Sequence, residues 1–141
     1  MTTRILIVDD HSMNRKLLRR HLEAQKDFMV VGEAEDGQEG IAKAETLRPD
    51  MILMDVAMPG MDGLEATRII HERLPQVKIL ILTLYSSSEN SIRALQSGAM
   101  GYVLKESIDE ELVAAIQAIM EGSYYFGAGV TNPLETWDAE A

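Results

Sequence analysis

The sequence predicts an α/β fold in which a parallel sheet lies between two layers of helices, a doubly wound arrangement. Two observations support this prediction. Short aliphatic runs alternate with longer segments of helical periodicity along most of the chain. Three of these runs, ILIV, MILM and ILIL, are apolar at every position. Strands that are buried on both faces have this composition, whereas strands with one solvated face alternate apolar and polar residues.

The aliphatic runs give five expected strands. The segments between them are long enough for the crossover helices that parallel neighbours require. The sequence therefore divides into five strand–helix units that end near residue 121. The expected strands are residues 4–8, 29–33, 51–54, 78–82 and 101–104.

The expected helices begin at recognisable capping residues. Ser12 precedes a helix in which Leu17, Leu18 and Leu22 are expected to turn inward. In the last helix apolar residues recur at helical spacing, and Gly122 follows as a stop signal. An Asp or Ser followed three positions later by Glu resembles a capping box. This pattern occurs at Asp36, Asp62, Ser86 and Ser107.

The composition is that of a single globular domain in water. The chain has 141 residues, of which 46% are hydrophobic and 26% are charged. The net charge of −10 repels phosphate backbones, so nucleic-acid binding by this chain is not expected. The absence of Cys excludes disulfides, thiolate zinc sites and thiol catalysis. No apolar run approaches the roughly 20 residues of a membrane span and no signal-peptide pattern is present, so we expect a cytoplasmic protein without membrane association.

The chain after Gly122 differs from the rest. It has no Lys or Arg and contains scattered Gly, Pro and aromatic residues. An ordered extension that packs Tyr124, Tyr125 and Phe126 on the domain and ends in a loose tail would have this composition. A linker to a further domain would look the same. The chain is therefore divided into a domain of residues 1–122 and a C-terminal extension or linker of residues 123–141.

Polar residues suited to chemistry follow four of the five expected strands. Asp9 and Asp10 follow ILIV, Asp55 follows MILM, Thr83 follows ILIL and Lys105 follows GYVL. Ligands of open parallel sheets bind outside the carboxyl ends of the strands, so these residues are expected to form one site. Taken singly, each has a plainer interpretation as a helix cap, a solvated lysine or a β-forming threonine.

Three clustered carboxylates repel one another strongly. Two unit charges about 4 Å apart cost around 4 kcal/mol at an effective dielectric of roughly 20. A hard divalent cation removes this repulsion, and an oxygen-only site suits Mg²⁺. Lys105 and Thr83 are suited to holding phosphoryl oxygens. Because a carboxylate can be the nucleophile in phosphoryl transfer, the site is predicted to form an aspartyl phosphate.

From residue 4 to about residue 122 the sequence resembles the receiver domain of two-component response regulators. The resemblance rests on the pair Asp9-Asp10, the segment DVAMPGMDG at 55–63, Thr83 and GYVLK at 101–105. It implies a flavodoxin-like (βα)5 sandwich with a five-stranded sheet in the order 2-1-3-4-5.

The resemblance also implies a role for each site residue. By position, Asp55 is the phosphoacceptor, and Asp9, Asp10 and Asp55 surround Mg²⁺. Thr83 is the switch hydroxyl that follows the phosphoryl group, and Lys105 forms an ion pair with that group.

Neighbouring residues have implied roles as well. The main-chain carbonyl of Ala57 would complete the metal site, and Gly63 would begin the next helix. Tyr102 occupies the position of an aromatic side chain that swings inward on activation, which makes it a second switch residue. Its plainer alternative is a half-exposed strand tyrosine.

The helices resemble the NarL/FixJ branch of the family. The phrases GEAEDGQEGI, GLEATRII, LQSGAMGYVLK and AIMEGSYYF carry this resemblance. That branch usually places a helix-turn-helix DNA-binding domain after such a segment. The roughly 20 residues that follow here are too few for that module and lack its basic patch. A stand-alone receiver and the regulatory part of a helix-turn-helix transcription factor both stay open.

The implied function is transfer of a phosphoryl group to Asp55 from a sensor histidine kinase or a phosphotransfer protein. Phosphorylation would switch the surface over residues 88–120, and homodimerisation is a further expectation. No enzymatic activity is expected beyond the chain's own phosphorylation and dephosphorylation. One alternative is a receiver-like interaction module that works without phosphorylation. A phosphatase with an Asp nucleophile is disfavoured, because such enzymes usually carry an acid where this chain has Ala57.

The residues that follow Thr83 and Asp55 depart from the commonest receiver pattern. The residue after Thr83 is often small, but here it is Leu84, and the bulky Tyr85 follows. Ala57 also offers no polar side chain beside Asp55. These neighbours shape the access of water to the acyl phosphate, so we expect an unusual or partner-dependent dephosphorylation rate.

The three histidines show no metal-ligand spacing. His11, His21 and His71 fall in three separate helical regions. A phosphotransfer histidine normally lies on a helical bundle, which the five expected strands argue against. We therefore interpret all three as surface or packing residues.

Overall fold

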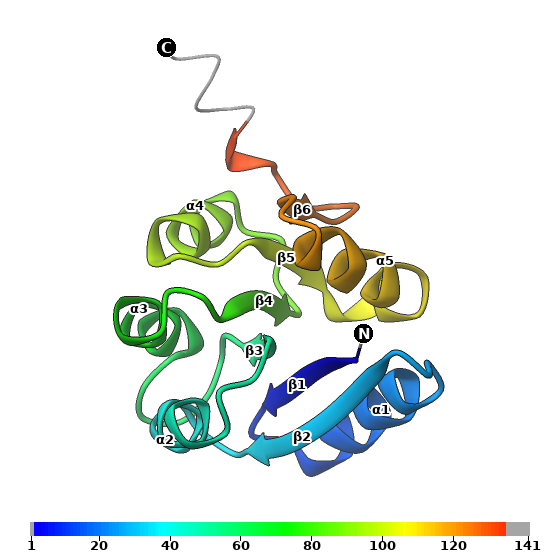
Figure 1. The fold of residues 1–141 in the computed structure, drawn as a ribbon. Coiled ribbons are helices and arrows are strands. Elements are labelled where there is room, and N and C mark those ends of the chain that lie inside the picture. The colour runs from blue at the N-terminus through cyan, green and yellow to red at the C-terminus, as the bar shows by residue number, and fades with distance from the viewer. Residues whose placement is uncertain (1, 135–141) are drawn as a thin grey trace.

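The computed structural model describes residues 2–134, which form one parallel sheet with helices on both faces (Figure 1). The strands are β1 (Thr3–Val8), β2 (Phe28–Ala34), β3 (Met51–Asp55), β4 (Lys78–Thr83), β5 (Gly101–Leu104) and β6 (Tyr125–Phe126). Their order is β2-β1-β3-β4-β5-β6, and every neighbouring pair is parallel. The predicted order of the first five strands is confirmed, and the short β6 extends the sheet beyond the five strands expected.

Five helices connect the strands and cover the sheet. They are α1 (Ser12–Glu23), α2 (Gly37–Leu47), α3 (Gly63–Arg73), α4 (Ser88–Ser97) and α5 (Ile108–Met120), with the 3-10 turn η1 (Lys105–Ser107) before α5. Helices α1 and α5 lie on one face, and α2, α3 and α4 lie on the other (Figure 1). Among the described residues, no helix has both the length and the apolar character needed to cross a membrane.

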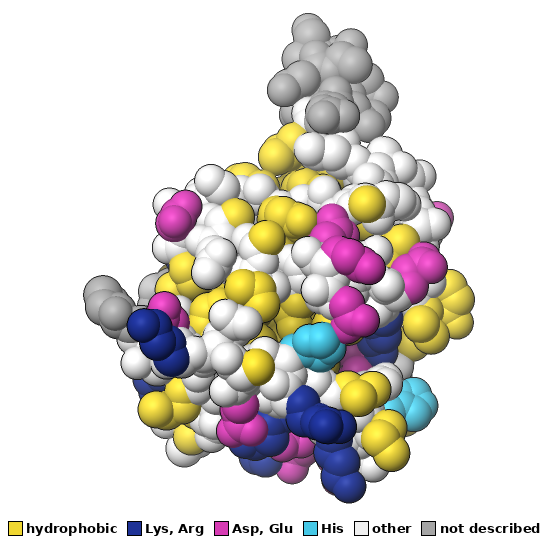
Figure 2. All heavy atoms as spheres, turned by 90° about the vertical axis from the view of Figure 1, so that its right-hand side faces the viewer, with side chains coloured by type: hydrophobic (Ala, Val, Ile, Leu, Met, Phe, Trp, Pro, Cys, Tyr) yellow, Lys and Arg dark blue, Asp and Glu magenta, His cyan; other side chains and the backbone are white. Residues whose placement is uncertain are grey.

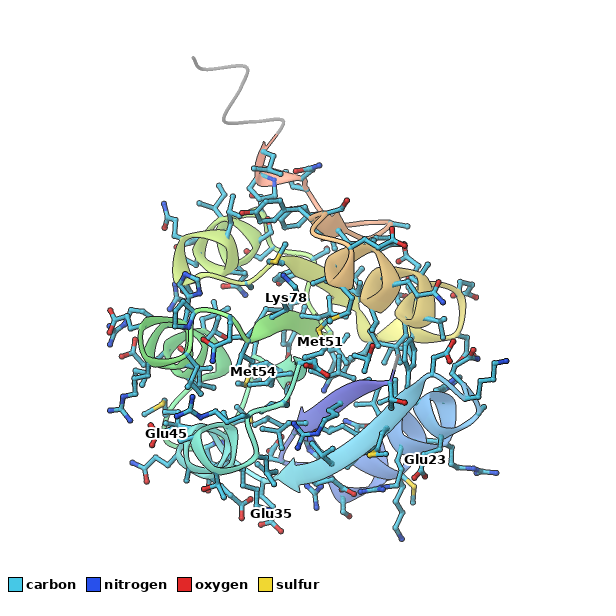
Figure 3. The ribbon with its side chains drawn as sticks, viewed as in Figure 1. Glu23, Glu35, Glu45, Met51, Met54 and Lys78 are labelled. Atoms are coloured by element: carbon cyan, nitrogen blue, oxygen red, sulfur yellow. The ribbon has the colours of Figure 1, made fainter. Side chains whose placement is uncertain are left out.

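The central strands are buried because they send alternate side chains into two apolar layers. On β3, Met51 packs in the layer under α1 and α5, whereas Met54 packs in the layer under α2, α3 and α4 (Figure 3). Glu23, Glu35 and Glu45 lie on the outer surface instead. Burial on both faces explains why the central runs contain no polar position.

Two of the four predicted capping boxes are confirmed at the N-cap. Asp36 accepts a hydrogen bond of 2.8 Å from the backbone N–H of Glu39 at the start of α2. Asp62 accepts an equivalent bond of 2.8 Å from the N–H of Glu65 at the start of α3. Each bond satisfies one of the backbone donors that the first turn of a helix leaves unpaired.

The other predicted helix starts are wrong in detail. Ser87, not Ser86, caps α4, because the helix begins one residue later than the pattern suggested. Ser107 makes no side-chain capping bond, since the turn η1 already leads into α5. At α1 the N-cap residue is His11, and Ser12 is the first helical residue.

Helix α1 is less buried than predicted. Leu18 and Leu22 are buried, but Leu17 is half-exposed, so its expected inward orientation is wrong. Residues four apart share a helix face, whereas Leu17 is turned by about 100° from Leu18. Leu17 and the exposed Met13 leave apolar surface on α1. Basic side chains gather over α1 on this side of the molecule, and acidic ones gather over α5 (Figure 2).

Residues 123–134 run along the outer edge of β5, and we call them the C-terminal strap. Within the strap, β6 pairs in parallel with β5. The N–H of Tyr125 donates to the carbonyl of Met100 at 3.0 Å, and the N–H of Gly127 donates to the carbonyl of Tyr102 at 2.9 Å. The edge of β5 is therefore paired.

Side chains anchor the strap to the two neighbouring helices. Glu111 on α5 accepts hydrogen bonds from the Tyr125 hydroxyl at 3.0 Å and from the Ala128 N–H at 2.9 Å. The buried Ser91 on α4 donates its hydroxyl to the carbonyl of Thr131 at 3.0 Å. The strap thus crosses from α5 to α4 over β5.

The aromatic residues of the strap behave as expected in two cases out of three. Tyr125 and Phe126 pack against the two apolar layers. Tyr124 is half-exposed, so its predicted packing is wrong. Alternate residues of a strand face opposite sides, and Tyr124 precedes the part that is paired with β5. The loose tail expected toward residue 141 lies outside the described residues from 135 onward.

Candidate functional site

The structure brings the predicted polar residues together at the carboxyl ends of β1, β3, β4 and β5. Asp9 and Asp55 are only 2% and 5% exposed, and Thr83 is also buried. The Lys105 ammonium lies 3.1 Å from Asp9 Oδ2 and 3.1 Å from Asp55 Oδ1. The joint placement expected from the strand ends is therefore observed, because parallel strands carry their carboxyl ends to one rim. The chemical roles of these residues stay predictions.

The charges at this rim perturb one another. Burial and, to a smaller extent, the neighbouring carboxylate of Asp9 raise the pKa of Asp55 to about 6, although Lys105 opposes the shift. Burial acts to lower the pKa of Lys105, but the charges of Asp55 and Asp9 outweigh it and raise that pKa. Lys105 is therefore charged at neutral pH and balances only part of the negative charge around it.

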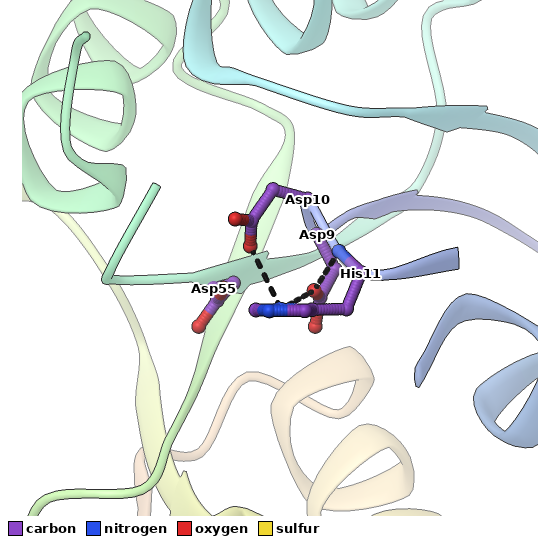
Figure 4. Close-up of side chains that lie close together, drawn as sticks. All are labelled: Asp9, Asp10, His11 and Asp55. Atoms are coloured by element: carbon purple, nitrogen blue, oxygen red, sulfur yellow. Dashed lines mark hydrogen bonds and ion pairs between the residues drawn. The ribbon is translucent and has the colours of Figure 1, made fainter. Parts of the chain in front are cut away.

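Four side chains could converge on a cation beside Lys105. Asp9, Asp10, His11 and Asp55 each offer one ligand atom, and these atoms lie within 4.8 Å of one another (Figure 4). Asp10 Oδ1 is buried and accepts no hydrogen bond within the described residues. A buried acceptor without a donor is costly unless a cation satisfies it. The donor set, three carboxylates and one imidazole, fits a divalent cation.

Sequence reasoning missed His11 as a member of this cluster. Its side chain is 67% exposed, which agrees with a surface histidine, but Nδ1 lies 3.1 Å from Asp10 Oδ1. Metal-ligand spacing among the three histidines was the wrong signal to examine. The useful signal was the position of His11 directly after the acidic pair, where the turn into α1 folds the ring back over the carboxylates.

The loop after β3 is shaped by a close approach of the backbone. The N–H of Gly63 donates to the carbonyl of Val56 at 2.9 Å. A Cβ at Gly63 would lie 1.8 Å from the carbonyl oxygen of Asp55, so only glycine fits there. As expected, Gly63 is the first residue of α3. Ala57 lies exposed in the same loop, and its carbonyl stays a predicted metal ligand.

The two predicted switch residues share one backbone partner. Thr83 Oγ1 accepts a hydrogen bond of 3.2 Å from the N–H of Tyr85, and the Tyr102 hydroxyl donates to the carbonyl of Tyr85 at 2.9 Å. Tyr102 is fully buried, so the alternative of a half-exposed tyrosine is wrong. The link through Tyr85 uses main-chain atoms, which carry no signal in the sequence.

The bulky residues that follow Thr83 point outward. Leu84 and Tyr85 are both exposed, large hydrophobic side chains. Their exposure places apolar surface on the segment that leads from β4 into α4. The predicted effect of this segment on dephosphorylation stays a prediction.

A cleft of about 310 Å³ opens next to the cluster, between α1 and α5. Asp9 and Lys105 form part of its wall, so the cleft reaches the buried charges from the outside. His21 and Asp109 also line it, and their ion pair of 2.9 Å joins α1 to α5. His71 is exposed on α3, on the other face of the sheet. The surface interpretation of His21 and His71 therefore agrees with the structure.

Comparisons with known proteins agree with this fold. The family model of the response regulator receiver domain matches residues 5–117. The response regulator protein VraR of Staphylococcus aureus is 43% identical over 126 residues. That alignment covers 89% of this chain and 60% of VraR, so the chain spans about three-fifths of the length of the curated relatives it matches.

Solved structures of similar proteins extend the comparison. A two-component response regulator of the LuxR family from Aurantimonas sp. SI85-9A1 has a TM-score of 0.90 and 36% identity, with 99% of both chains covered. The signal receiver domain of NarL from Mycobacterium tuberculosis has a TM-score of 0.82 and 31% identity, covering 86% of this chain and 98% of that one.

Proposed function

Because this chain belongs to the response regulator receiver domain family of two-component systems, we propose that it takes part in phosphoryl transfer. In this proposal, Asp55 accepts a phosphoryl group from a phosphohistidine. The donor is a sensor histidine kinase or a phosphotransfer protein. The observation that carries the proposal is the placement of Asp55. Its carboxylate is buried at the end of a central strand and faces the Lys105 ammonium at 3.1 Å. A nucleophile beside a fixed cation is suited to attack on a charged phosphoryl group.

The proposed step is an in-line transfer. A carboxylate oxygen of Asp55 attacks the phosphorus, the phosphorus–nitrogen bond of the phosphohistidine breaks, and its electron pair returns to the imidazole. Asp55 must be ionised to attack, and with a pKa of about 6 it is mostly ionised at neutral pH. Lys105 and the Thr83 hydroxyl would hold phosphoryl oxygens as negative charge accumulates on them.

Mg²⁺ is part of the proposal. Asp9, Asp10 and Asp55 would hold it with their carboxylates, together with the main-chain carbonyl of Ala57. The unbonded, buried oxygen Asp10 Oδ1 supports a cation at this position. When bound, Mg²⁺ supplies positive charge that neutralises the transferring phosphoryl group. Oxygen ligands are the ones that Mg²⁺ prefers.

The proposed output begins at Thr83. Phosphorylation adds roughly 1.5 to 2 negative charges at Asp55, and the Thr83 hydroxyl is expected to turn toward them. Thr83 and Tyr102 are both bonded to the main chain of Tyr85, so a movement of Thr83 disturbs the contact that Tyr102 makes. The population then shifts between two packed states of α4, β5 and α5, without a new fold.

The wider role follows the family by analogy. We propose that residues 1–122 are the receiver domain and that residues 123–141 are an extension or linker. The chain would work alone or as the regulatory part of a helix-turn-helix transcription factor, and phosphorylation would tune homodimerisation. Its only proposed catalysis is its own phosphorylation and dephosphorylation.

Intact mass spectrometry tests the proposal directly. The wild type, Asp55→Asn and the control Asp27→Asn are incubated with Mg²⁺ and a small acyl-phosphate donor. Asp27 is an exposed carboxylate far from the rim, so its variant matches the lost charge only. We expect one added phosphoryl group in the wild type and the control, dependent on Mg²⁺, and none in Asp55→Asn.

Other outcomes favour the alternatives. No adduct in any variant, either with the small donor or with histidine kinases, would favour an interaction module that works without phosphorylation. Steady turnover of a small phosphoester would favour a phosphatase. An adduct that survives Asp55→Asn would place the phosphoryl group elsewhere and refute the assignment.

A further inference from the structure

The imidazole of His11 lies at the cation cluster and has no part in the proposed phosphoryl transfer. His11 is the N-cap residue of α1, yet its side chain makes no capping hydrogen bond. In the described part of the chain, the ring forms ion-pair contacts with Asp9 and Asp10, and a carboxylate oxygen of Asp55 lies within 4.8 Å of it. The backbone N–H of His11 donates to Asp9 Oδ1 at 2.9 Å, which fixes the residue over the carboxylates. The ring therefore sits at the cluster without serving the fold.

The positions of the His11 and Asp10 side chains suit a shared cation better than a hydrogen bond between them. His11 Nδ1 lies 3.1 Å from Asp10 Oδ1 and 3.6 Å from Asp9 Oδ1. Two neighbouring ligands bound about 2.1 Å from an octahedral metal lie about 3 Å apart, which matches the first distance. Despite this proximity, Asp10 Oδ1 accepts no hydrogen bond from any of residues 2–134. The nitrogen and the oxygen are thus in ion-pair contact (Figure 4), but the contact does not have the geometry of a hydrogen bond.

We propose that His11 Nδ1 is an additional ligand of the cation held by Asp9, Asp10 and Asp55. The inference rests on the metal site of the proposed function. An imidazole nitrogen suits borderline divalent cations such as Ni²⁺, Cu²⁺ and Zn²⁺, whereas Mg²⁺ and Mn²⁺ prefer oxygen. The site therefore takes this class of transition metals with a selectivity that three carboxylates alone do not give.

Calorimetric titration of Ni²⁺, Mn²⁺ and Mg²⁺ separates the contributions of nitrogen and oxygen ligands. The variants are His11→Asn and the control His71→Asn, which removes an exposed imidazole from the other face of the sheet. Asn is a favourable N-cap residue, so His11→Asn keeps the start of α1 intact. We expect Ni²⁺ affinity to fall by roughly tenfold or more, as for other residues that tune metal sites, and Mg²⁺ affinity to change far less.

A spectroscopic measurement gives a second readout that does not depend on affinity. Bound Cu²⁺ should show nitrogen hyperfine coupling in its electron paramagnetic resonance spectrum for the wild type and His71→Asn. The coupling should be lost in His11→Asn. Coupling that persists in His11→Asn would overturn the assignment of the ligand.

The titration distinguishes failure of this inference from failure of the metal site itself. An unchanged ratio of Ni²⁺ to Mg²⁺ affinity in His11→Asn, with Mg²⁺ still bound, would overturn the role of His11 alone. Tighter binding of all three cations in His11→Asn would also overturn it, because the ring would then compete with the cation. A wild type that binds no divalent cation would refute both the inference and the proposed Mg²⁺ site.

Discussion

The two borders of β5 are built on different physical principles. At its carboxyl end, Lys105 faces the buried charges of Asp9 and Asp55. The neighbouring Asp10 has a buried oxygen that accepts no hydrogen bond in the part of the chain that the structure describes. Along its outer edge, the strap pairs its backbone with β5 and donates to the carboxylate of Glu111. The first border thus contains a polar atom without a hydrogen-bond partner, whereas the polar groups named at the second border are hydrogen-bonded. We therefore expect stability at the first border to depend on divalent cations and on pH between about 4 and 6, and stability at the second to be independent of divalent cations.

The largest effect is expected for Lys105→Ala. Removing one partner of a buried ion pair costs about 3–5 kcal/mol, because Asp9 and Asp55 are left facing each other. Saturating Mg²⁺ should recover much of this loss, since a ligand that binds only the folded state stabilises it. Urea unfolding with and without Mg²⁺ measures the effect, with the exposed Lys16→Ala as control. A loss of stability that Mg²⁺ does not reduce would contradict the expected difference between the two borders.

The next effect is a pH dependence caused by Asp55. Its pKa is raised to about 6 in the folded chain, from an ordinary value of 3.8. Asp55 therefore stays protonated to a higher pH in the folded state than in the unfolded state. Stability should therefore fall as pH rises from about 4 to about 6 and stay lower above that range. At about 1.4 kcal/mol per pKa unit, the fall is about 3 kcal/mol at most.

Asp55→Asn should remove this fall and be more stable than the wild type at pH 7 without Mg²⁺. Urea unfolding between pH 4.5 and 7.5 compares the two chains. Wild-type and variant curves that run parallel across this range would contradict the assigned pKa.

At the other border, Gly101→Ala should destabilise the strap. A Cβ at Gly101 would lie 2.7 Å from Ile119 Cδ1, 2.8 Å from Leu80 Cδ1 and 2.9 Å from the carbonyl oxygen of Tyr125. Overpacking of this kind costs about 1–3 kcal/mol. Hydrogen exchange of the Tyr125 amide should accelerate, and the loss should be equal with and without Mg²⁺. A Mg²⁺-dependent loss would show that the two borders are coupled.

The smallest effect is expected for Glu111→Gln. The amide keeps one acceptor for the Tyr125 hydroxyl and the Ala128 N–H but loses the charge that strengthens both bonds. We expect the strap to lose about 1 kcal/mol of local stability. The effect should be visible as faster hydrogen exchange of the Ala128 amide. Glu110→Gln, an exposed neighbour, should leave that exchange rate unchanged. Equally faster exchange in both variants would show that the net charge of α5, and not the hydrogen bonds to Glu111, holds the strap.

The sequence was sufficient for features that depend on topology. The wholly apolar runs identified the buried strands, and strand direction alone brought Asp55, Thr83 and Lys105 to one rim. Parallel strands leave no other place for residues that follow them, so no side-chain detail was needed.

Features that depend on one residue of register, or on main-chain contacts, could not be predicted. The cap of α4 moved from Ser86 to Ser87 because adjacent serines offer the same hydroxyl to the first turn. The two-residue β6 has no periodicity to detect and exists through its bonds to β5. The contact between Tyr102 and the carbonyl of Tyr85 uses an atom that every residue carries.

The strap also sets the geometry of any polypeptide joined to its end. Twelve residues of free chain, 123–134, would reach up to about 40 Å, but on the edge of β5 they contribute no slack. The fastening of Thr131 to Ser91 makes the takeoff point a fixed position beside α4. A partner joined to this end would be held at a high effective concentration near that helix, and release of the strap would lower that concentration by lengthening the tether. The pairing of the strap with the edge of β5 therefore sets the length of flexible chain between the domain and such a polypeptide.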